Sequence, residues 1–314
     1  MRPDFFFVDR QSLRATIGIV DRKRGGEGVT MSMHGRIVRR ALGSGRWYPR
    51  EPAVLRRAVT EFIEAAAVPP ITGRIVGAIA PHAGYVYSGP VAGYTFRALR
   101  EQAARGLGPT TVVVLGFPHR GGFPGVAFLD GDALATPLGE APLDPAALAL
   151  LMEASPRLQA DARPHAGEHS AENEVPFVQA ALPNAKLVVG LIGDHTDDTL
   201  NELNAGLARL AARQALVVVA SSDMLHDPDY DRVTRTDQAT LRRLAALDAA
   251  GLQRDWSYER QTLCGLAPVL ATLRFALAQG CRQGTVLRYR NSGDDHPESR
   301  GDWVVGYGAV VFTI

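Results

Sequence analysis

The chain has 314 residues, of which 46% are hydrophobic and 21% are charged, a composition that excludes disordered, collagen-like and coiled-coil proteins. Its 34 basic and 33 acidic residues leave a net charge of +1, and no block of like charge is long enough to bind a nucleic acid or a membrane surface. Two cysteines are too few for a disulfide framework, and no run reaches the roughly 18 apolar residues of a membrane helix. We therefore expect a folded cytoplasmic protein without nucleic-acid or membrane partners.

Residues 1–35 show no hydrophobic periodicity, so we expect a disordered or irregular extension there, followed by a single α/β domain over 36–314. The hydrophobic pattern of the domain predicts helices at 52–67, 90–105, 197–213, 236–251 and 265–279, the second of them beginning at Pro90. It predicts strands at 74–80, 111–116, 187–193, 216–220, 285–290 and 304–313. Apolar strands that alternate with helices indicate a mixed, largely parallel central sheet covered by helices on both faces.

Three of the predicted strands are followed by a histidine at the edge of the sheet where ligands bind in folds of this kind. His82 follows strand 74–80, His119 follows strand 111–116, and His226 follows strand 216–220. His82 and His119 are separated by about one βαβ unit, which predicts that they lie side by side on neighbouring parallel strands. Two adjacent imidazoles form half of a site for zinc, iron, copper or nickel.

Cys264 is the best thiolate candidate for a third ligand. It stands at the start of a predicted apolar helix, where the positive end of the helix is expected to lower the pKa of the thiol. Cys281, at the other end of that helix, has no comparable setting. The structural alternative is a buried cysteine and two histidines on surface loops.

The acidic segment 168–174 precedes an apolar stretch at 175–182. Ser170 could cap a helix that carries acidic residues in its first turn. In the functional interpretation, Glu168 and His169 lie on the loop before that helix and support the metal ligands or carry protons. His226 is open to two interpretations as well, as a helix cap or as an acid–base residue.

Together these residues show that the sequence resembles the Memo family (AmmeMemoRadiSam system protein B), whose fold is similar to that of class III extradiol ring-cleaving dioxygenases. The most specific motif of the family, APHAGYxYSGPVA, corresponds to residues 80–92. Further matches are residues 46–49, 114–119, 168–177, 221–226 and 264–265. Order and spacing agree from about residue 40 to residue 314. One motif departs from the family, because Pro-Ser-His-His is replaced by Phe-Pro-His-Arg at 117–120.

The resemblance implies a metal site formed by His82, His119 and Cys264, and it puts His226 in the position of the dioxygenases' catalytic acid–base histidine. Five further residues are then expected to shape the pocket or to support the ligands: Tyr85, Tyr87, Glu168, His169 and Asp223. Ring-cleaving relatives use two histidines and a glutamate on Fe(II), whereas a thiolate is softer and more easily oxidised.

These residues and the resemblance lead us to expect a metal-dependent, dioxygenase-like oxidoreductase with an unknown substrate. Iron (Fe²⁺) is the favoured cofactor, copper is the alternative, and zinc is less favoured. A function of a different class is a non-catalytic binding module that uses the same cleft for a small molecule or a peptide. Zinc-dependent hydrolysis ranks last, since no carboxylate that could act as a general base follows either metal histidine within a few residues.

Overall fold

The computed structural model describes residues 29–31, 35–257 and 259–314. Its main sheet consists of β3 (Ile75–Ala80), β4 (Thr111–Gly116), β5 (Val126–Phe128), β8 (Leu158–Ala160), β9 (Lys186–Ile192), β10 (Leu216–Ser221), β11 (His226–Asp227), β12 (Gly284–Asn291) and β13 (Val304–Thr313). The strand order is β11-β13-β3-β10-β4-β9-β5-β8, and β12 pairs with β13. The central strands β3, β10, β4 and β9 are parallel to one another, while β13 and β5 pair with them antiparallel. The predicted mixed, largely parallel sheet is confirmed.

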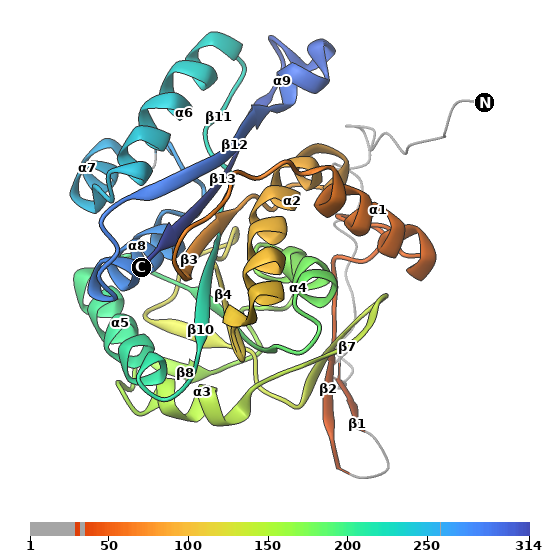
Figure 1. Cartoon of the computed structure of the whole chain (residues 1–314), viewed down its shortest axis with the longest axis vertical. Coiled ribbons are helices and arrows are strands. Elements are labelled where there is room, and N and C mark those ends of the chain that lie inside the picture. The colour runs from red at the N-terminus through yellow and green to blue at the C-terminus, as the bar shows by residue number, and fades with distance from the viewer. Residues whose placement is uncertain (1–28, 32–34, 258) are drawn as a thin grey trace, which may run out of the picture.

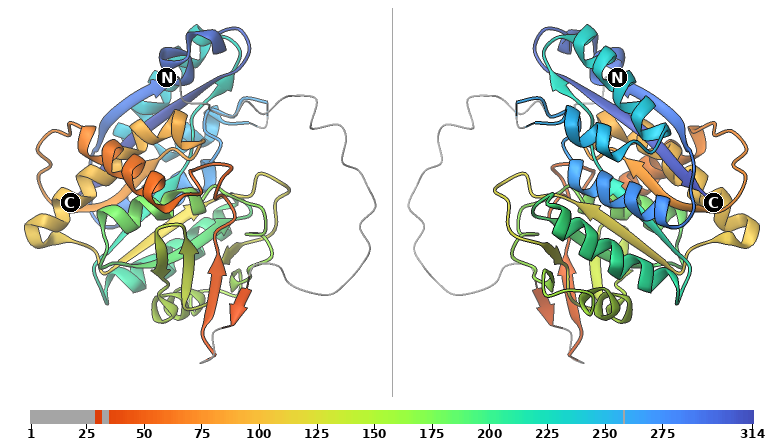
Figure 2. Two further views of the ribbon diagram at one scale, coloured as in Figure 1. Left: turned by 90° about the vertical axis from the view of Figure 1, so that its right-hand side faces the viewer. Right: turned by 90° about the vertical axis from the view of Figure 1, so that its left-hand side faces the viewer.

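Helices cover both faces of this sheet (Figures 1 and 2). One face carries α1 (Pro52–Ala65), α2 (Tyr85–Gln102) and α4 (Val175–Ala181), and the other carries α3 (Pro145–Met152), α5 (Asp197–Ala211), α6 (Tyr230–Ala245), α7 (Ala249–Asp255) and α8 (Leu266–Ala278). Each layer buries its own large hydrophobic cluster against the sheet. A short helix, α9 (Ser292–Asp295), follows β12. Within the described ranges, no helix is both long and apolar enough to span a membrane.

A smaller sheet has the order β1-β2-β6-β7 and consists of β1 (Val29–Met31), β2 (Ile37–Arg40), β6 (Ala133–Thr136) and β7 (Gly139–Pro142). Strand β1 falls inside the extension that we expected to be irregular. For these three residues the prediction is wrong, because their backbone pairs antiparallel with β2. Residues 1–28 and 32–34, which make up most of the predicted extension, lie outside the described residues.

Helix α2 begins at Tyr85 and not at Pro90 as predicted, so the proline lies inside the helix. Tertiary contacts account for the earlier start. The backbone N–H of Tyr85 donates to Trp47 O at 2.9 Å, and its buried ring packs between Tyr48 and Phe177. These contacts outweigh the one helical hydrogen bond that Pro90 cannot make.

The helix predicted at 236–251 is two helices, α6 and α7. Asp229 caps α6 and Asp248 caps α7, each by accepting a backbone hydrogen bond in the first turn. Between the helices, Leu247 has a left-handed backbone conformation with φ of 53°, which no helix interior allows. Its buried side chain anchors the break in the core.

Candidate metal centre

The carboxyl ends of three parallel strands support the candidate centre. Because β10 lies between β3 and β4, the prediction that His82 and His119 lie on neighbouring strands is wrong. Their rings nevertheless meet, with centroids 5.4 Å apart. Both histidines stand beyond the ends of their strands, and the strand between them ends in the small residue Ser221, which leaves room for the two imidazoles.

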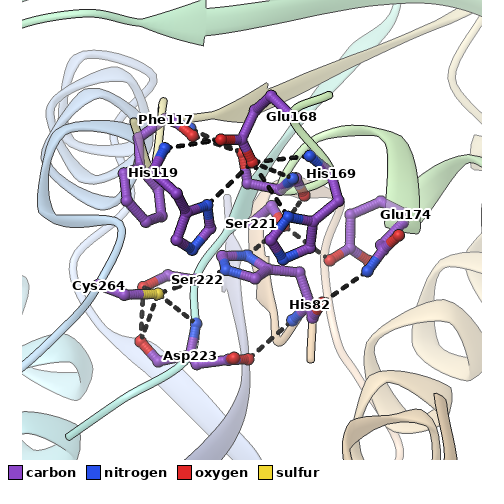
Figure 3. A network of polar contacts seen from close by, with 12 residues as sticks. His82, Phe117, His119, Glu168, His169, Glu174, Ser221, Ser222, Asp223 and Cys264 are labelled. Carbon is purple, nitrogen blue, oxygen red and sulfur yellow. Dashed lines mark hydrogen bonds and ion pairs between the residues drawn. The ribbon is translucent and has the colours of Figure 1, made fainter. Parts of the chain in front are cut away.

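The buried His82 presents its Nε2 to the centre (Figure 3). Its Nδ1 lies 2.9 Å from Ser221 Oγ, and that hydroxyl donates in turn to Ser170 O or Glu174 Oε1. Since the single hydroxyl proton is used there, Nδ1 carries the imidazole proton and Nε2 keeps its lone pair. Burial lowers the pKa of His82 to about 3, so the ring is neutral, which is the form that binds metals.

Glu168 holds His119 in the same way. The Nδ1 of His119 donates to Glu168 Oε1 at 2.9 Å, which leaves Nε2 available. Glu168 also accepts backbone hydrogen bonds from His119, His169 and Ser170. Burial acts against ionisation, but the hydrogen bonds from His119 and from these backbone groups hold the pKa of Glu168 well below its usual value. Glu168 therefore acts as a carboxylate that orients a candidate metal ligand.

His169, which we expected only to support the ligands or to carry protons, lies close enough to be a ligand itself. Its ring stacks on Trp47 on one side, at 3.8 Å between centroids, and on His119 on the other, at 4.6 Å. Ring nitrogens of His82, His119 and His169 all lie within 4.8 Å of one another. Burial and the two neighbouring imidazoles lower the pKa of His169 to about 3. A third neutral imidazole is thus in reach of the same ion.

Cys264 approaches the centre from the opposite side (Figure 3). Its Sγ lies 3.4 Å from His82 Nε2 and accepts a hydrogen bond from the Asp223 backbone at 3.1 Å. The donor atoms of His82, Asp223 and Cys264 lie within 4.8 Å of one another, whereas those of the predicted set His82, His119 and Cys264 do not all do so. The glycine after Cys264 permits this approach, because a Cβ on Gly265 would lie 2.7 Å from Ser221 O.

The expectation that the helix end lowers the pKa of Cys264 is wrong. Helix α8 begins at Leu266, directly after the Gly265 cap, as predicted within one residue. Burial and the nearby Asp223 carboxylate nevertheless raise the pKa of the thiol well above its usual value. A thiolate at this half-buried position therefore needs a neighbouring cation, which a bound metal ion would supply.

His226 lies at the edge of the cluster. It belongs to β11, where it pairs with Val305, and it does not cap a helix, since Asp229 caps α6. Its Nε2 is buried, lies 4.0 Å from Asp223 Oδ2, and has no hydrogen-bond partner in the part of the chain that the structure describes. Burial lowers the pKa of His226, although the Asp223 carboxylate acts in the opposite direction.

The two tyrosines that we expected to shape the pocket or to support the ligands differ in their surroundings. Tyr85 is buried in the core behind the centre, where its hydroxyl donates to Asn173 O at 2.6 Å. Tyr87 is exposed, and its ring packs beside His296. Trp47 and Ser221 contact the imidazoles but were not among the predicted site residues. Both lie in segments matched to the family motifs, and Ser221 also directly follows the predicted strand 216–220.

Comparison with known proteins agrees with this architecture. A family model described as Memo-like protein matches residues 39–311. A MEMO1 family protein of Methanopyrus kandleri is 33% identical over 281 residues, which cover 86% of this chain and 96% of that protein. A MEMO1 family protein of Methanothermobacter thermautotrophicus is 34% identical over 280 residues, 86% of this chain and 99% of that protein. The large, mostly parallel sheet flanked by helices is consistent with a Memo or extradiol dioxygenase-like fold. The chain belongs to the Memo family.

Proposed function

We propose that the protein is a metal-dependent oxidoreductase that binds iron, or else copper, at the cluster around His82. The observation that carries the proposal is that His82 belongs to two overlapping groups of donor atoms. One group adds two imidazoles, from His119 and His169, and the other adds Asp223 and Cys264. Imidazole and carboxylate are ligands of non-haem Fe(II), while imidazole and thiolate also suit copper.

We assign His82, His119 and Cys264 as the protein ligands, which requires an ion to draw together donor atoms that do not all lie within 4.8 Å of one another. The Nδ1 atoms of His82 and His119 are engaged by Ser221 and Glu168, so the Nε2 of each ring is available to an ion. Such contacts fix the tautomer of a histidine ligand and raise its basicity. Cys264 adds the sulfur donor closest to His82. His169, which stacks on His119, is the competing third ligand, and the experiment below separates the two assignments.

A bound iron or copper ion would supply one-electron chemistry with dioxygen. The residues around it would move protons. Asp223 Oδ1 accepts the backbone hydrogen bonds of His82 at 2.8 Å and Ala83 at 3.2 Å, which holds its Oδ2 near His226. His226 Nε2 has no hydrogen-bond partner among the described residues, so it is available to accept and return a proton.

Metal content tests the ligand assignment. We expect protein purified without chelator, or loaded anaerobically with Fe(II) or Cu(I), to hold near-stoichiometric metal by elemental analysis. His82→Ala and Cys264→Ala should both lose it, whereas His169→Ala should retain it. Cys281→Ala is the matched control, because the sulfur of this buried cysteine contacts Gln283 O and not the histidines. Full metal retention by Cys264→Ala, together with loss in His169→Ala, would assign the ion to the three histidines instead.

Oxygen consumption tests the reaction class. With the bound metal and a panel of phenolic compounds, the proposal predicts turnover that disappears in His226→Gln while the metal content stays unchanged. Stoichiometric binding of such compounds without any turnover would contradict the oxidoreductase and would support a binding module.

A further inference from the structure

A cavity of about 630 Å³ is lined in part by His226, the residue at the edge of the candidate centre. Its walls come from β11, from α6, from the segment that leads to Cys264, and from the turn before β13. The lining residues that matter here are His226, Arg232, Arg235, Arg260, Thr262 and Trp303.

His226 connects the cavity to the cluster. Its ring lines the cavity, while its Nε2 lies 4.0 Å from Asp223 Oδ2. Thr262 is a second link, since it lines the cavity two residues before Cys264. A molecule in this cavity would therefore contact the residue that we propose moves protons.

The charges on the cavity wall favour an anion. Arg232 is paired with Asp227 at 3.2 Å, and the wall residue Asp255 is paired with Arg243 at 2.6 Å. These pairs leave the guanidinium groups of Arg235 and Arg260 without a hydrogen bond or an ion pair to any described residue. The wall carries three arginines and three carboxylates in all, and Glu259 is the one wall carboxylate without such a partner within the described ranges, so two unpaired guanidinium groups stand against one unpaired carboxylate.

The cavity also offers an aromatic surface. Trp303 is 54% exposed, and its ring lies edge-on to that of His226 with centroids 6.2 Å apart. An exposed indole on a pocket wall is a surface on which a planar ring can stack. Guanidinium groups, for their part, match the planar geometry of a carboxylate and bind it through paired hydrogen bonds.

We propose that this cavity binds a small aromatic carboxylate, with its carboxylate on Arg235 and Arg260 and its ring on Trp303. The assignment of the cavity as a substrate pocket rests on the proposed function. Its assignment as a binding site for an aromatic carboxylate depends only on the residues of the cavity. The ring would lie next to His226.

Benzoate is the probe, and benzamide is its uncharged counterpart. Calorimetric titration, followed in parallel by tryptophan fluorescence, should show saturable binding of benzoate at millimolar concentrations or below, and much weaker binding of benzamide. Arg235→Met and Arg260→Met should each weaken benzoate binding about tenfold, because each removes a charge-assisted contact. Arg56→Met is the control, since Arg56 is an exposed arginine on α1, on the opposite side of the molecule from α6 in Figure 1.

The pocket assignment is overturned if benzoate does not bind saturably, if benzamide binds equally well, or if both cavity arginines can be replaced without effect. Metal content of the same preparations keeps this failure separate from that of the proposed function. If the protein takes up no metal but binds benzoate through the two arginines, the metal centre is refuted and the pocket is kept. If the protein takes up metal but does not bind benzoate, the pocket is refuted and the metal centre is kept.

Discussion

The imidazoles of His82 and His119 are oriented by contacts to the nitrogen that points away from the cluster. For His82 the contact is a serine that is itself tied to Glu174, and for His119 it is the ionised carboxylate of Glu168. Metal ligands in proteins are commonly held in this way, and the supporting group contributes to affinity without touching the ion. The arrangement therefore makes Glu168 a positioning residue whose role can be measured.

Replacing Glu168 by glutamine tests this role. The variant keeps the shape of the side chain but loses the negative charge that orients His119, so metal affinity should fall about 10- to 100-fold. Competition with a chelator of known affinity measures the change. Glu61→Gln, on the exposed surface of α1, serves as the control and should leave the affinity unaltered. Equal affinities in the two variants would show that Glu168 is not needed to position the ligand.

Asp237 predicts a pH dependence of stability that is independent of the metal. This carboxylate is fully buried under β13, where it accepts hydrogen bonds from the Leu225 backbone and the Tyr289 hydroxyl, and burial raises its pKa from 3.8 to about 7. The folded state thus holds a proton that the unfolded state has already released. The contribution of Asp237 to the free energy of unfolding is therefore fully present below about pH 4. It decreases as the pH rises from about 4 to about 7, and it is absent at higher pH.

The variant Asp237→Asn should remove this decline. Urea unfolding between pH 4 and pH 8 should show that the wild type loses on the order of 4 kcal/mol relative to the variant across this range. Comparing the two proteins cancels the contributions of the other buried carboxyl groups. Parallel stability curves would mean that Asp237 does not titrate in this window.

Among single residues, His82, His119, His226 and Cys264 could be selected from the sequence because strand ends and a helix start are local patterns. The stacking of Trp47, His169 and His119 could not be predicted from the sequence. Trp47 lies more than a hundred positions before His169, and no local spacing indicates that two such distant side chains pack face to face.

At the scale of helices, α1 and α2 pack so closely that a glycine is required between them. A Cβ on Gly93 would lie 2.3 Å from Phe62 O and 2.7 Å from Phe62 C. This contact fixes α2, whose first residue follows the loop that carries His82. The helix therefore positions the candidate centre through packing with α1.

Gly93→Ala should destabilise the fold. Alanine improves helix propensity by about 1 kcal/mol, but overpacking against a backbone carbonyl costs about 1–3 kcal/mol, so a net loss is expected. Urea denaturation measures it. An unchanged or higher midpoint would show that the helices can separate without cost, contrary to the packing described here.

The length of a helix or strand determines whether its hydrophobic pattern could be recognised in the sequence. The long apolar strands at the centre of the sheet and helix α5 were predicted to within two residues at each end, because their hydrophobic periodicity extends over several residues. Strands β5 to β8 have only three or four residues each, too few to show a period. The start of α2 and the division of α6 from α7 depend on tertiary contacts and on the backbone of Leu247.

For the molecule as a whole, strand order is what the sequence could not supply. Hydrophobic patterning predicted the class of sheet, but not that β10 inserts between β3 and β4. That insertion brings Ser221 and Asp223 beside His82, so β10 and the segment after it supply the Asp223 of one of the two groups of donor atoms. The candidate centre is therefore a product of topology as much as of its ligands.

X-ray absorption spectroscopy of the metal-loaded protein tests the central claim most directly, namely that an ion binds between His82 and Cys264. We predict an iron or copper edge with sulfur and imidazole nitrogen in the first coordination shell, and loss of the sulfur contribution in Cys264→Ala. A first shell without sulfur in the wild type, or protein that takes up no iron or copper at all, would contradict the account.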